Sequence, residues 1–201
     1  MNGKIILDLC GGTGAWSLPY KEVGYDVRNI TLPGYDVRTY ILPNEPIYGI
    51  LAAPPCTMFS DARTNAKTAR DLRGGMEIVE ACLKLIYEAQ YRTVSDQQKY
   101  SPVKFWAIEN PYFGRLRWFL GKPVFVFDPW EFGDVYKKRT ALWGLFNEPI
   151  KIYKNINEVK MEGQILKGVN NLDYWKDTKN RQTLRSITPQ GFARAFFEVN
   201  K

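Results

Sequence analysis

Three short apolar runs, each followed at once by residues that stop a β-strand, constrain the fold of this chain more than any other feature. The runs are residues 4–9, 47–53 and 105–108. A glycine-rich turn follows the first, two prolines follow the second and a Glu-Asn-Pro tripeptide follows the third. Glycine and proline interrupt the hydrogen-bonded ladder of a central strand. Each run is therefore predicted to be a buried strand that ends where polar or reactive residues begin.

A helix pattern alternates with these strands. Residues 76–90 carry apolar side chains at helical spacing, namely Val79, Cys82, Leu83 and Ile86. Further strands are predicted at residues 25–31, 123–127 and 140–143. A C-terminal helix is predicted, with Thr188 as its N-cap and Pro189 at its first position. This alternation predicts an α/β fold with a mostly parallel sheet and helices on both faces.

The length and composition fit one domain. The chain has 201 residues, 45% of them hydrophobic, which is enough for a single packed core, so we expect one domain over residues 1–201. No apolar run approaches the roughly 18 residues that cross a bilayer. The first residues also lack the pattern of a signal peptide. These features predict a soluble, cytoplasmic protein with no membrane partner.

Few residue types are available for chemistry. The chain has no histidine, and its three cysteines, Cys10, Cys56 and Cys82, have no CxxC spacing. Neither a disulfide framework nor a metal site is predicted. Proton transfer is therefore left to carboxylates, Cys, Lys or Tyr.

The positive charge lies in the second half of the chain. The net charge is +7, and residues 1–100 hold 11 basic and 11 acidic side chains, whereas residues 101–201 hold 17 and 10. A cationic face suits a polyanion such as DNA, because neutralising phosphates supplies most nonspecific affinity for nucleic acid. A merely soluble basic surface has the same composition and stays as the alternative.

The turn after the first run, Cys10–Gly14 in LDLCGGTGAWS, is typical of a site for a nucleotide or an adenosyl group. Glycines let the backbone approach a ligand, and the N-terminus of the following helix carries partial positive charge. Plain loop geometry is the alternative. The GGTG spacing also differs from the GxGxxG of dinucleotide sites.

Two candidate catalytic residues follow the other two runs. Cys56, in APPCTMFS, comes after two prolines that hold it away from the ladder, and a thiol is a strong nucleophile near neutral pH. Glu109, in FWAIENP, follows an apolar strand, where burial raises a carboxyl pKa and fits it to donate a proton. The alternatives are an inert buried cysteine and a capping or surface glutamate. Cys10 and Cys82 are predicted to be inert.

Together and in this order, LDLCGGTG, PPCTMFS and ENP resemble the main motifs of the cytosine-5 DNA methyltransferase family. The resemblance covers roughly residues 4–145, and the tail TPQGFARAFFEVN is similar to that of small, often phage-borne members. It implies a Rossmann-like methyltransferase fold, S-adenosylmethionine as cofactor, with S-adenosylhomocysteine as product, and a bacterial or phage-infected cell. It also implies that Cys56 attacks carbon 6 of cytosine while Glu109 contacts ring nitrogen 3. The target base must leave its stack to be reached.

The resemblance also implies a cofactor site, with two departures from the family. Cys10 stands where the family has an aromatic residue, so Trp16 is expected to supply the ring. Thr31 stands where the family has an acidic residue for the ribose hydroxyls, whereas Asp36 and Val37 match the pair that contacts the adenine. The implied cofactor-binding residues are Asp8, Cys10, Gly11, Gly12, Thr13, Gly14, Trp16, Thr31, Asp36, Val37 and Pro54.

A third departure concerns the basic segment YKKRTALWG. The family's Gln-x-Arg-x-Arg pattern is reduced here to Lys137, Arg139 and Ala141. The resemblance implies that Arg139 holds the carbonyl oxygen of the cytosine, as a third catalytic residue beside Cys56 and Glu109.

The region that recognises the substrate is expected to be small. Only 58 residues follow Trp143, fewer than the usual recognition domain of the family, so residues 145–187 are predicted to be a reduced recognition segment. Within it, Tyr174 and Trp175 are available for stacking on bases. A second copy of the chain, in a homo-oligomer, or a partner chain is the other expected source of recognition.

A basic segment follows the candidate nucleophile. Residues 61–75 resemble the mobile loop that closes over substrate in this family, and an ordinary solvated loop is the alternative. Its basic residues are Arg63, Lys67, Arg70 and Arg73.

Three functions stay open at this point. The first is methylation of cytosine in DNA, duplex or single-stranded. The second is the same chemistry on RNA or a free cytosine nucleotide. The third is a catalytically silent protein that binds the adenosyl group or nucleic acid, against which the intact Cys56 and Glu109 argue. All depend on one expectation, that Cys56 and Glu109 face a common cavity beside the glycine turn.

Overall fold

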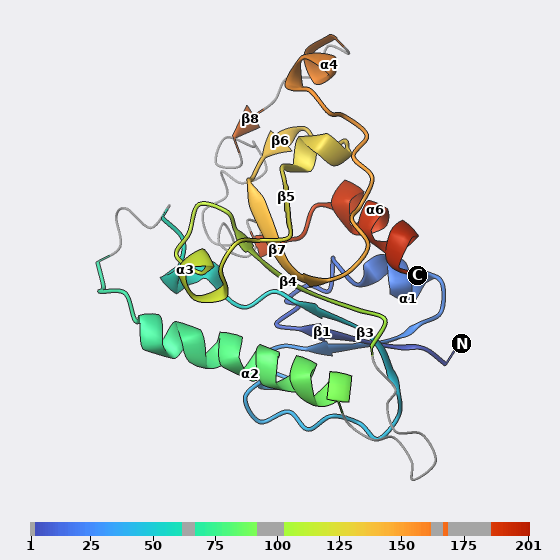
Figure 1. Cartoon of the computed structure of the whole chain (residues 1–201), viewed down its shortest axis with the longest axis vertical. Helices are drawn as coiled ribbons and strands as arrows, with labels where there is room; N and C mark the ends of the chain where they lie inside the picture. The colour runs from blue at the N-terminus through green and yellow to red at the C-terminus, as the bar shows by residue number, and fades with distance from the viewer. Residues whose placement is uncertain (1–2, 62–66, 92–102, 162–166, 169–185) are drawn as a thin grey trace.

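A computed structural model of the chain describes residues 3–61, 67–91, 103–161, 167–168 and 186–201 (Figure 1). Its centre is a six-stranded sheet in the order β2-β1-β3-β4-β7-β5. β2, β1, β3 and β4 are parallel to one another, and β7 runs antiparallel to both β4 and β5. The predicted α/β fold with a mostly parallel sheet is confirmed. The strands are β1 Ile5–Leu9, β2 Asp26–Ile30, β3 Ile47–Ala52, β4 Phe105–Pro111, β5 Phe125–Phe127 and β7 Thr140–Leu145.

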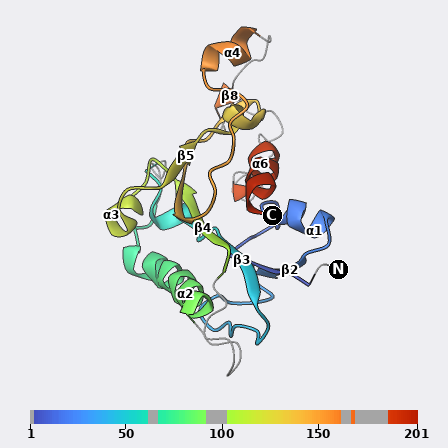
Figure 2. The ribbon, with the colours of Figure 1, turned by 45° about the vertical axis from the view of Figure 1, so that its right-hand side comes forward.

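Helices cover both faces of the sheet, as predicted. α2 lies along one face, and α1 and α6 lie on the other, which Figure 2 shows from the side. A small second sheet pairs β6 with β8. These elements are α1 Leu18–Glu22, α2 Leu72–Tyr91, α3 Arg117–Leu120, α4 Ile156–Met161, α6 Gln190–Asn200, β6 Tyr136–Lys137, β8 Lys167–Gly168 and the 3-10 turns η1 Cys56–Met58 and η2 Pro129–Phe132.

Two hydrophobic cores follow from the alternation of side chains along the strands. In β1, Ile6 packs into an aromatic core with Phe192 and Phe196 of α6. Its neighbours Ile5 and Leu7 point to the opposite face and pack in the core under α2. Because both faces of β1 are covered, the strand is apolar almost throughout, and its single polar residue, Asp8, is buried with it. That residue belongs to the site described below.

The long helix begins earlier than its apolar stripe predicts. α2 starts at Leu72, whereas the prediction was residues 76–90, so the last part of the predicted mobile loop is helical. The backbone N–H of Gly74 donates to Asp71 Oδ1 at 2.8 Å, as at a helix N-terminus. A Cβ on Gly75 would lie 3.0 Å from Cβ of Met58, so glycine allows α2 to pack closely on η1. Helix propensity alone disfavours a glycine here, and the close approach of η1 is the reason that glycine fits at position 75.

β4 is longer than its apolar run. The prediction ended the strand at Ile108, but pairing continues to Pro111, opposite Thr140 of β7. β3 accompanies β4 only as far as Ile108, so the last three residues of β4 are paired on one side alone among the described residues. Tertiary pairing with a distant strand therefore extends a segment that local pattern ends.

The C-terminal helix begins one residue later than predicted. Its N-cap is Pro189, not Thr188, because Pro189 has an extended ψ of 135° and its carbonyl accepts the first helical bond from Ala193 N–H at 2.9 Å. Phe192 and Phe196 are fully buried, as the predicted apolar face requires, and Val199 is half-buried.

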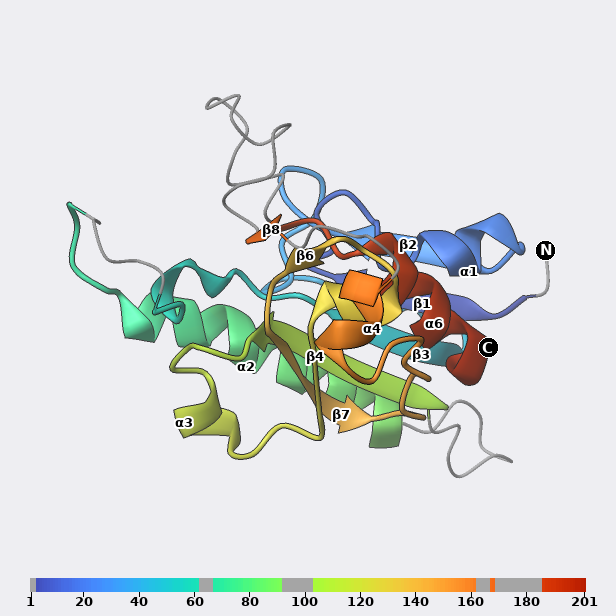
Figure 3. The same ribbon diagram turned by 90° about the horizontal axis from the view of Figure 1, so that it is seen from above.

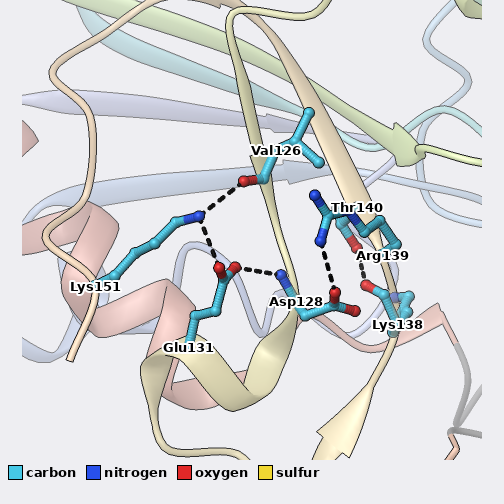
Figure 4. Close-up of polar contacts among 7 residues, drawn as sticks. All are labelled: Val126, Asp128, Glu131, Lys138, Arg139, Thr140 and Lys151. Atoms are coloured by element: carbon cyan, nitrogen blue, oxygen red, sulfur yellow. Dashed lines mark hydrogen bonds and ion pairs between the residues drawn. The ribbon is translucent and has the colours of Figure 1, made fainter. Parts of the chain in front are cut away.

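The start of the predicted recognition segment packs on the rest of the domain. Lys151 Nζ donates to the carbonyl of Val126 at 3.1 Å and pairs with Glu131 Oε1 at 2.9 Å (Figure 4). Glu131 also closes a capping box with Asp128 at the start of η2. Residues 169–185, with Tyr174 and Trp175, lie outside the described residues, and the recognition role of 145–187 stays a prediction.

Candidate active site

Strand register aligns the carboxyl ends of three parallel strands. Leu9 of β1 is opposite Ala52 of β3, and Ala52 is opposite Ile108 of β4. The residues that follow, Cys10, Ala53 and Glu109, therefore form one row at the same edge of the sheet. β1 lies between β2 and β3, so the chain passes from β1 to β2 on one side and then crosses to β3 on the other side of β1. Ligands of open α/β sheets bind at such a switch point.

A cleft with an empty volume of about 620 Å³, part of it open to solvent, lies at this edge. Nine of the predicted site residues line it, namely Asp8, Cys10, Gly11, Gly12, Thr13, Trp16, Pro54, Cys56 and Glu109. It is also lined by residues that the sequence analysis did not predict for the site, namely Ala53, Pro55, Pro111, Lys138, Ser186 and Thr188.

The glycine turn is tight, and its left-handed positions include a cysteine. Cys10 has φ 56° and Gly12 has φ 54°. A non-glycine residue in this region is uncommon and marks a constrained backbone. Here Cys10 N–H donates to the carbonyl of Ile30 at 2.8 Å, which anchors the turn to β2. A Cβ on Gly11 would lie only 2.3–2.5 Å from the carboxyl atoms of Asp8, so glycine is required beside that carboxylate.

Asp8 is a buried carboxylate with one unsatisfied oxygen. Oδ2 accepts from Ser17 Oγ at 2.5 Å, whereas Oδ1 has no hydrogen-bond partner. Burial raises the pKa of Asp8 to about 6, partly offset by the Ser17 hydrogen bond. An unsatisfied buried carboxylate oxygen is costly unless a ligand completes it.

Trp16 offers a complementary donor. Its ring packs against Phe192 and Phe196, with centroids 5.9 and 5.4 Å away, and its Nε1–H is buried without a partner. Asp8 and Trp16 both line the cleft, and each keeps one buried polar atom without a partner, the acceptor Asp8 Oδ1 and the donor Trp16 Nε1. A ligand that carries both an ammonium and a carboxylate, as an amino-acid group does, matches this pair.

Cys10 and Cys82, the two cysteines other than the candidate nucleophile Cys56, interact. Cys82 of α2 hydrogen bonds to Cys10, and this bond lowers the pKa of the Cys10 thiol against the opposite effects of burial and the carboxylates of Asp8 and Asp36. Burial and the same bond raise the pKa of Cys82. Cys82 is buried in the core under α2, as predicted for an inert cysteine.

Cys56 begins the η1 turn directly after the double proline. Its carbonyl accepts from Phe59 N–H at 2.9 Å and from Ser60 N–H at 2.8 Å, and the buried Phe59 ring anchors the turn. Arg70 donates to the carbonyls of Met58 and Ser60, both at 2.9 Å. The thiol is half-buried and borders the cleft. Arg70 thereby joins the segment after the nucleophile to the start of α2.

Glu109 and Asn110 connect the third motif to the second. Asn110 Nδ2 donates to the carbonyl of Pro54 at 2.9 Å, which holds the end of β4 against the turn that carries Cys56. Burial raises the pKa of Glu109, and the nearby Lys138 ammonium partly lowers it. A carboxyl with a raised pKa is suited to donate a proton or a hydrogen bond.

Lys138, not Arg139, lines the cleft. Arg139 Nη1 pairs with Asp128 Oδ2 at 3.2 Å (Figure 4). The Arg139 guanidinium also lies 5.8 Å from the centre of the Tyr112 ring. Successive side chains in extended backbone point to opposite sides, so of two adjacent cations only one faces the site. The KKR run was a signal for a cation here, but it did not determine which one.

Four other predicted residues lie outside the lining of the cleft. Thr31, Asp36 and Val37 follow β2, next to the end of β1, and Gly14 closes the glycine turn. Arg38 donates to both oxygens of Asp36 and, with its backbone N–H, holds the pKa of Asp36 at about 2. Val37 is buried in the core under α2.

The predicted basic loop is described only in part. Arg63 lies outside the described residues. Lys67 is exposed, and Arg73 lies in α2, 3.9 Å from Glu77. The closing motion expected of residues 61–75 stays a prediction.

Comparison with known proteins gives a likeness in structure alone. No family model matches the chain, and no curated protein matches it. Among solved structures, it is similar to a methyltransferase of Entamoeba histolytica, EhMeth, with a TM-score of 0.42 and 10% identity. The match covers 77% of this chain and 57% of EhMeth, so the chain spans little more than half the length of that protein. We therefore argue function from the site itself.

Two searches of the described residues give negative results. No helix in that part of the chain combines the length and apolarity needed to span a membrane. In the same residues, no three or more His, Cys, Asp or Glu side chains form a group that would hold a metal ion.

Proposed function

We propose that the chain is an S-adenosylmethionine-dependent methyltransferase that methylates carbon 5 of cytosine in DNA. One observation carries the proposal: Cys56, Glu109 and the glycine turn with Asp8 border a single cleft at the carboxyl ends of β1, β3 and β4. The motifs that resemble the cytosine-5 family lie 40 or more residues apart in the chain. Their convergence on one cleft is what covalent methylation of a base requires.

The cofactor's charged groups match the wall formed by the glycine turn. Asp8 Oδ1 would accept from its ammonium, and Trp16 Nε1 would donate to its carboxylate; both protein atoms lack another partner. The adenosine would extend toward the end of β2, where Thr31, Asp36 and Val37 follow the strand that pairs with β1. When bound, S-adenosylmethionine supplies a methyl group on a sulfonium.

Cys56 and Glu109 act on the base from the other wall. The Cys56 thiolate adds to carbon 6 of cytosine, while Glu109, whose pKa burial raises, donates its proton to ring nitrogen 3. Addition makes carbon 5 nucleophilic, and that carbon would take the methyl group, with S-adenosylhomocysteine as the leaving product. Loss of the carbon 5 proton to a base, departure of the Cys56 thiolate and return of the nitrogen 3 proton to Glu109 then restore the ring and the acid.

Lys138 is the cation best suited to the carbonyl oxygen of the base. It borders the cleft and acts electrostatically on Glu109. We assign it the contact that the family resemblance implied for Arg139. Arg139, paired with Asp128, would instead contact the substrate at the rim.

Covalent trapping tests the proposal. The protein is incubated with S-adenosylmethionine and DNA that contains 5-fluorocytosine, and adducts are resolved on a denaturing gel. Fluorine cannot leave as the proton does, so a working enzyme stays attached through Cys56. Wild type should form the adduct, and Cys56→Ser should not. Cys82→Ala, which removes a thiol from the core under α2 and keeps Cys56, is the matched control and should still form it.

Other outcomes separate the alternatives. An adduct with a fluorinated RNA or free nucleotide, and none with DNA, would identify a different acceptor for the same chemistry. Cofactor binding without an adduct on any acceptor would indicate the silent binder. An adduct that persists in Cys56→Ser would refute the assigned nucleophile.

A further inference from the structure

Large aromatic side chains lie exposed just beyond the end of β4. Phe113 is 62% exposed, Trp118 65% and Phe119 48%. All three come from the short segment that follows Pro111 and includes α3, which projects on the side of the molecule opposite α1 (Figures 1 and 3). Clustered exposed aromatics mark binding surfaces more often than chance exposure.

Arginines are interleaved with these rings. The guanidinium of Arg115 lies 5.3 Å from the Trp118 ring centre, and those of Arg117 and Arg139 lie 5.7 and 5.8 Å from the Tyr112 ring centre. Residues 110–127 contain three cations and no carboxylate. One carboxylate outside this segment, that of Asp61, lies 3.6 Å from Arg115 Nε. We call Tyr112, Phe113, Arg115, Arg117, Trp118 and Phe119 the 112–119 surface.

The 112–119 surface is fixed by backbone bonds to the segment that carries Cys56. Arg115 N–H donates to the carbonyl of Phe59 at 2.9 Å, and Asp61 N–H donates to the carbonyl of Phe113 at 3.2 Å. Between them, Ser60 and Gly114 form a β-bridge. The surface therefore keeps a constant position relative to the candidate nucleophile.

We propose that the 112–119 surface is a binding site for a single-stranded polynucleotide, and that it holds the nucleotides next to the base in the cleft. This inference rests on the proposed function. Exposed rings stack on bases of any sequence, and arginines between them meet the phosphates. A duplex buries its base faces, so the surface favours an unpaired strand. Such a site would hold the substrate strand without strict sequence recognition.

Equilibrium binding tests this site without depending on catalysis. The probes are a fluorescein-labelled DNA strand of about 15 nucleotides, comparable to the site size of single-strand binders, an RNA of the same sequence and the annealed DNA duplex. Fluorescence anisotropy gives each dissociation constant. Wild type should bind the single strands more tightly than the duplex, and the DNA and RNA arms identify the preferred strand.

Variants locate the binding to this surface. Phe113→Ala and Trp118→Ala should each weaken single-strand binding by about 5- to 150-fold, the usual effect of losing one stacked base. Trp118→Phe keeps a ring and should retain most of the affinity. Tyr87→Ala is the matched control, because Tyr87 is also 65% exposed but lies on α2. Arg117→Gln should reduce the slope of log affinity against log salt by about 0.7.

The results separate this inference from the proposed function. If Trp118→Ala weakens single-strand binding but neither the wild type nor any variant is trapped covalently, the surface is sustained and the methyl transfer is refuted. If the Phe113→Ala/Trp118→Ala double variant is trapped on DNA as well as wild type and binds single strands as tightly, the methyl transfer is sustained and the surface is overturned. Tighter binding of the duplex, or of a protein partner instead of either strand, would also overturn it.

Discussion

The two walls of the cleft are built in different ways. The first wall, formed by Asp8 and the residues that follow it up to Trp16, comes from one stretch of chain, and Asp8 and Trp16 at its two ends are buried. The second wall, with Cys56, Glu109 and Lys138, is assembled from three distant segments that bonds such as Asn110–Pro54 hold together. In our proposal the local wall binds a cofactor of constant structure, whereas the assembled wall positions reactive groups around a base.

The walls also differ in how they use a buried carboxyl. Burial raises the pKa of both Asp8 and Glu109. In our proposal Asp8 meets an ammonium and ionises, whereas Glu109 meets a neutral ring and keeps its proton. The same physical effect thus supports cofactor binding in one wall and proton donation in the other. Changes at each carboxyl should therefore affect different measurements.

The largest effect is expected at Glu109. Glu109→Gln keeps the shape of the side chain but removes the acidic proton, so the rate of methyl transfer should fall about 10²- to 10⁴-fold, the usual contribution of a positioned acid. Cofactor affinity, measured by calorimetry, should not change. Glu77→Gln, at an exposed carboxyl on α2, is the control. If Glu109→Gln weakened the cofactor as much as the rate, the division between the walls would be wrong.

Asp8→Asn should produce the opposite pattern. Loss of a charge-assisted hydrogen bond should weaken S-adenosylmethionine binding by about 10- to 150-fold. The unliganded protein should gain stability, because the folded pKa of Asp8, about 6, lies above its ordinary value of 3.8. The stability contributed by Asp8 is present below about pH 4 and is lost as pH rises through 6, a difference of about 3 kcal/mol. Urea unfolding at pH 8 and pH 4 measures this gain, which should appear only at pH 8.

A smaller effect follows for the pH dependence of cofactor binding. Binding of an ammonium requires ionised Asp8, so affinity should rise about tenfold per pH unit below pH 6 and level off above it. Calorimetry in buffers of different ionisation enthalpy should detect release of a proton on binding near pH 5. Affinity that is constant from pH 5 to 8 would show that Asp8 does not meet the ammonium.

The smallest effect is expected at Lys138. Its ammonium lowers the pKa of Glu109, so Lys138→Gln should raise that pKa further. Because the protonated acid is the active form, the fall in rate at alkaline pH should move to higher pH, by less than about one unit. The pH profile of kcat measures the shift, and Lys137→Gln, at an exposed neighbour, should leave it unchanged. A shift produced by Arg139→Gln instead would restore Arg139 as the residue facing the base.

Local sequence pattern predicted most of the strands and the candidate residues, because buried strands are apolar and the glycines, prolines or polar residues that end them lie within a few neighbouring positions. The apolar runs before Cys10, Pro54 and Glu109 are strands in the structure, and the residues after them border the cleft. The start of α2 was missed because its first turn contains two glycines, which helix propensity disfavours, and its N-terminal hydrogen bond to Asp71 and its packing on η1 are not visible in the apolar pattern. The length of β4 was missed because a distant strand extends it.

The amino-acid order by itself determined which residue types end each strand, and therefore which chemistry is available to this protein. Only the tertiary structure decided that these ends align, through the register of β1 with β3 and β4. It also decided that Lys138 faces the cleft and that the rings of 112–119 stay exposed beside Cys56. The physical reason is that register, side-chain facing and surface exposure depend on contacts between distant segments, which no local pattern encodes.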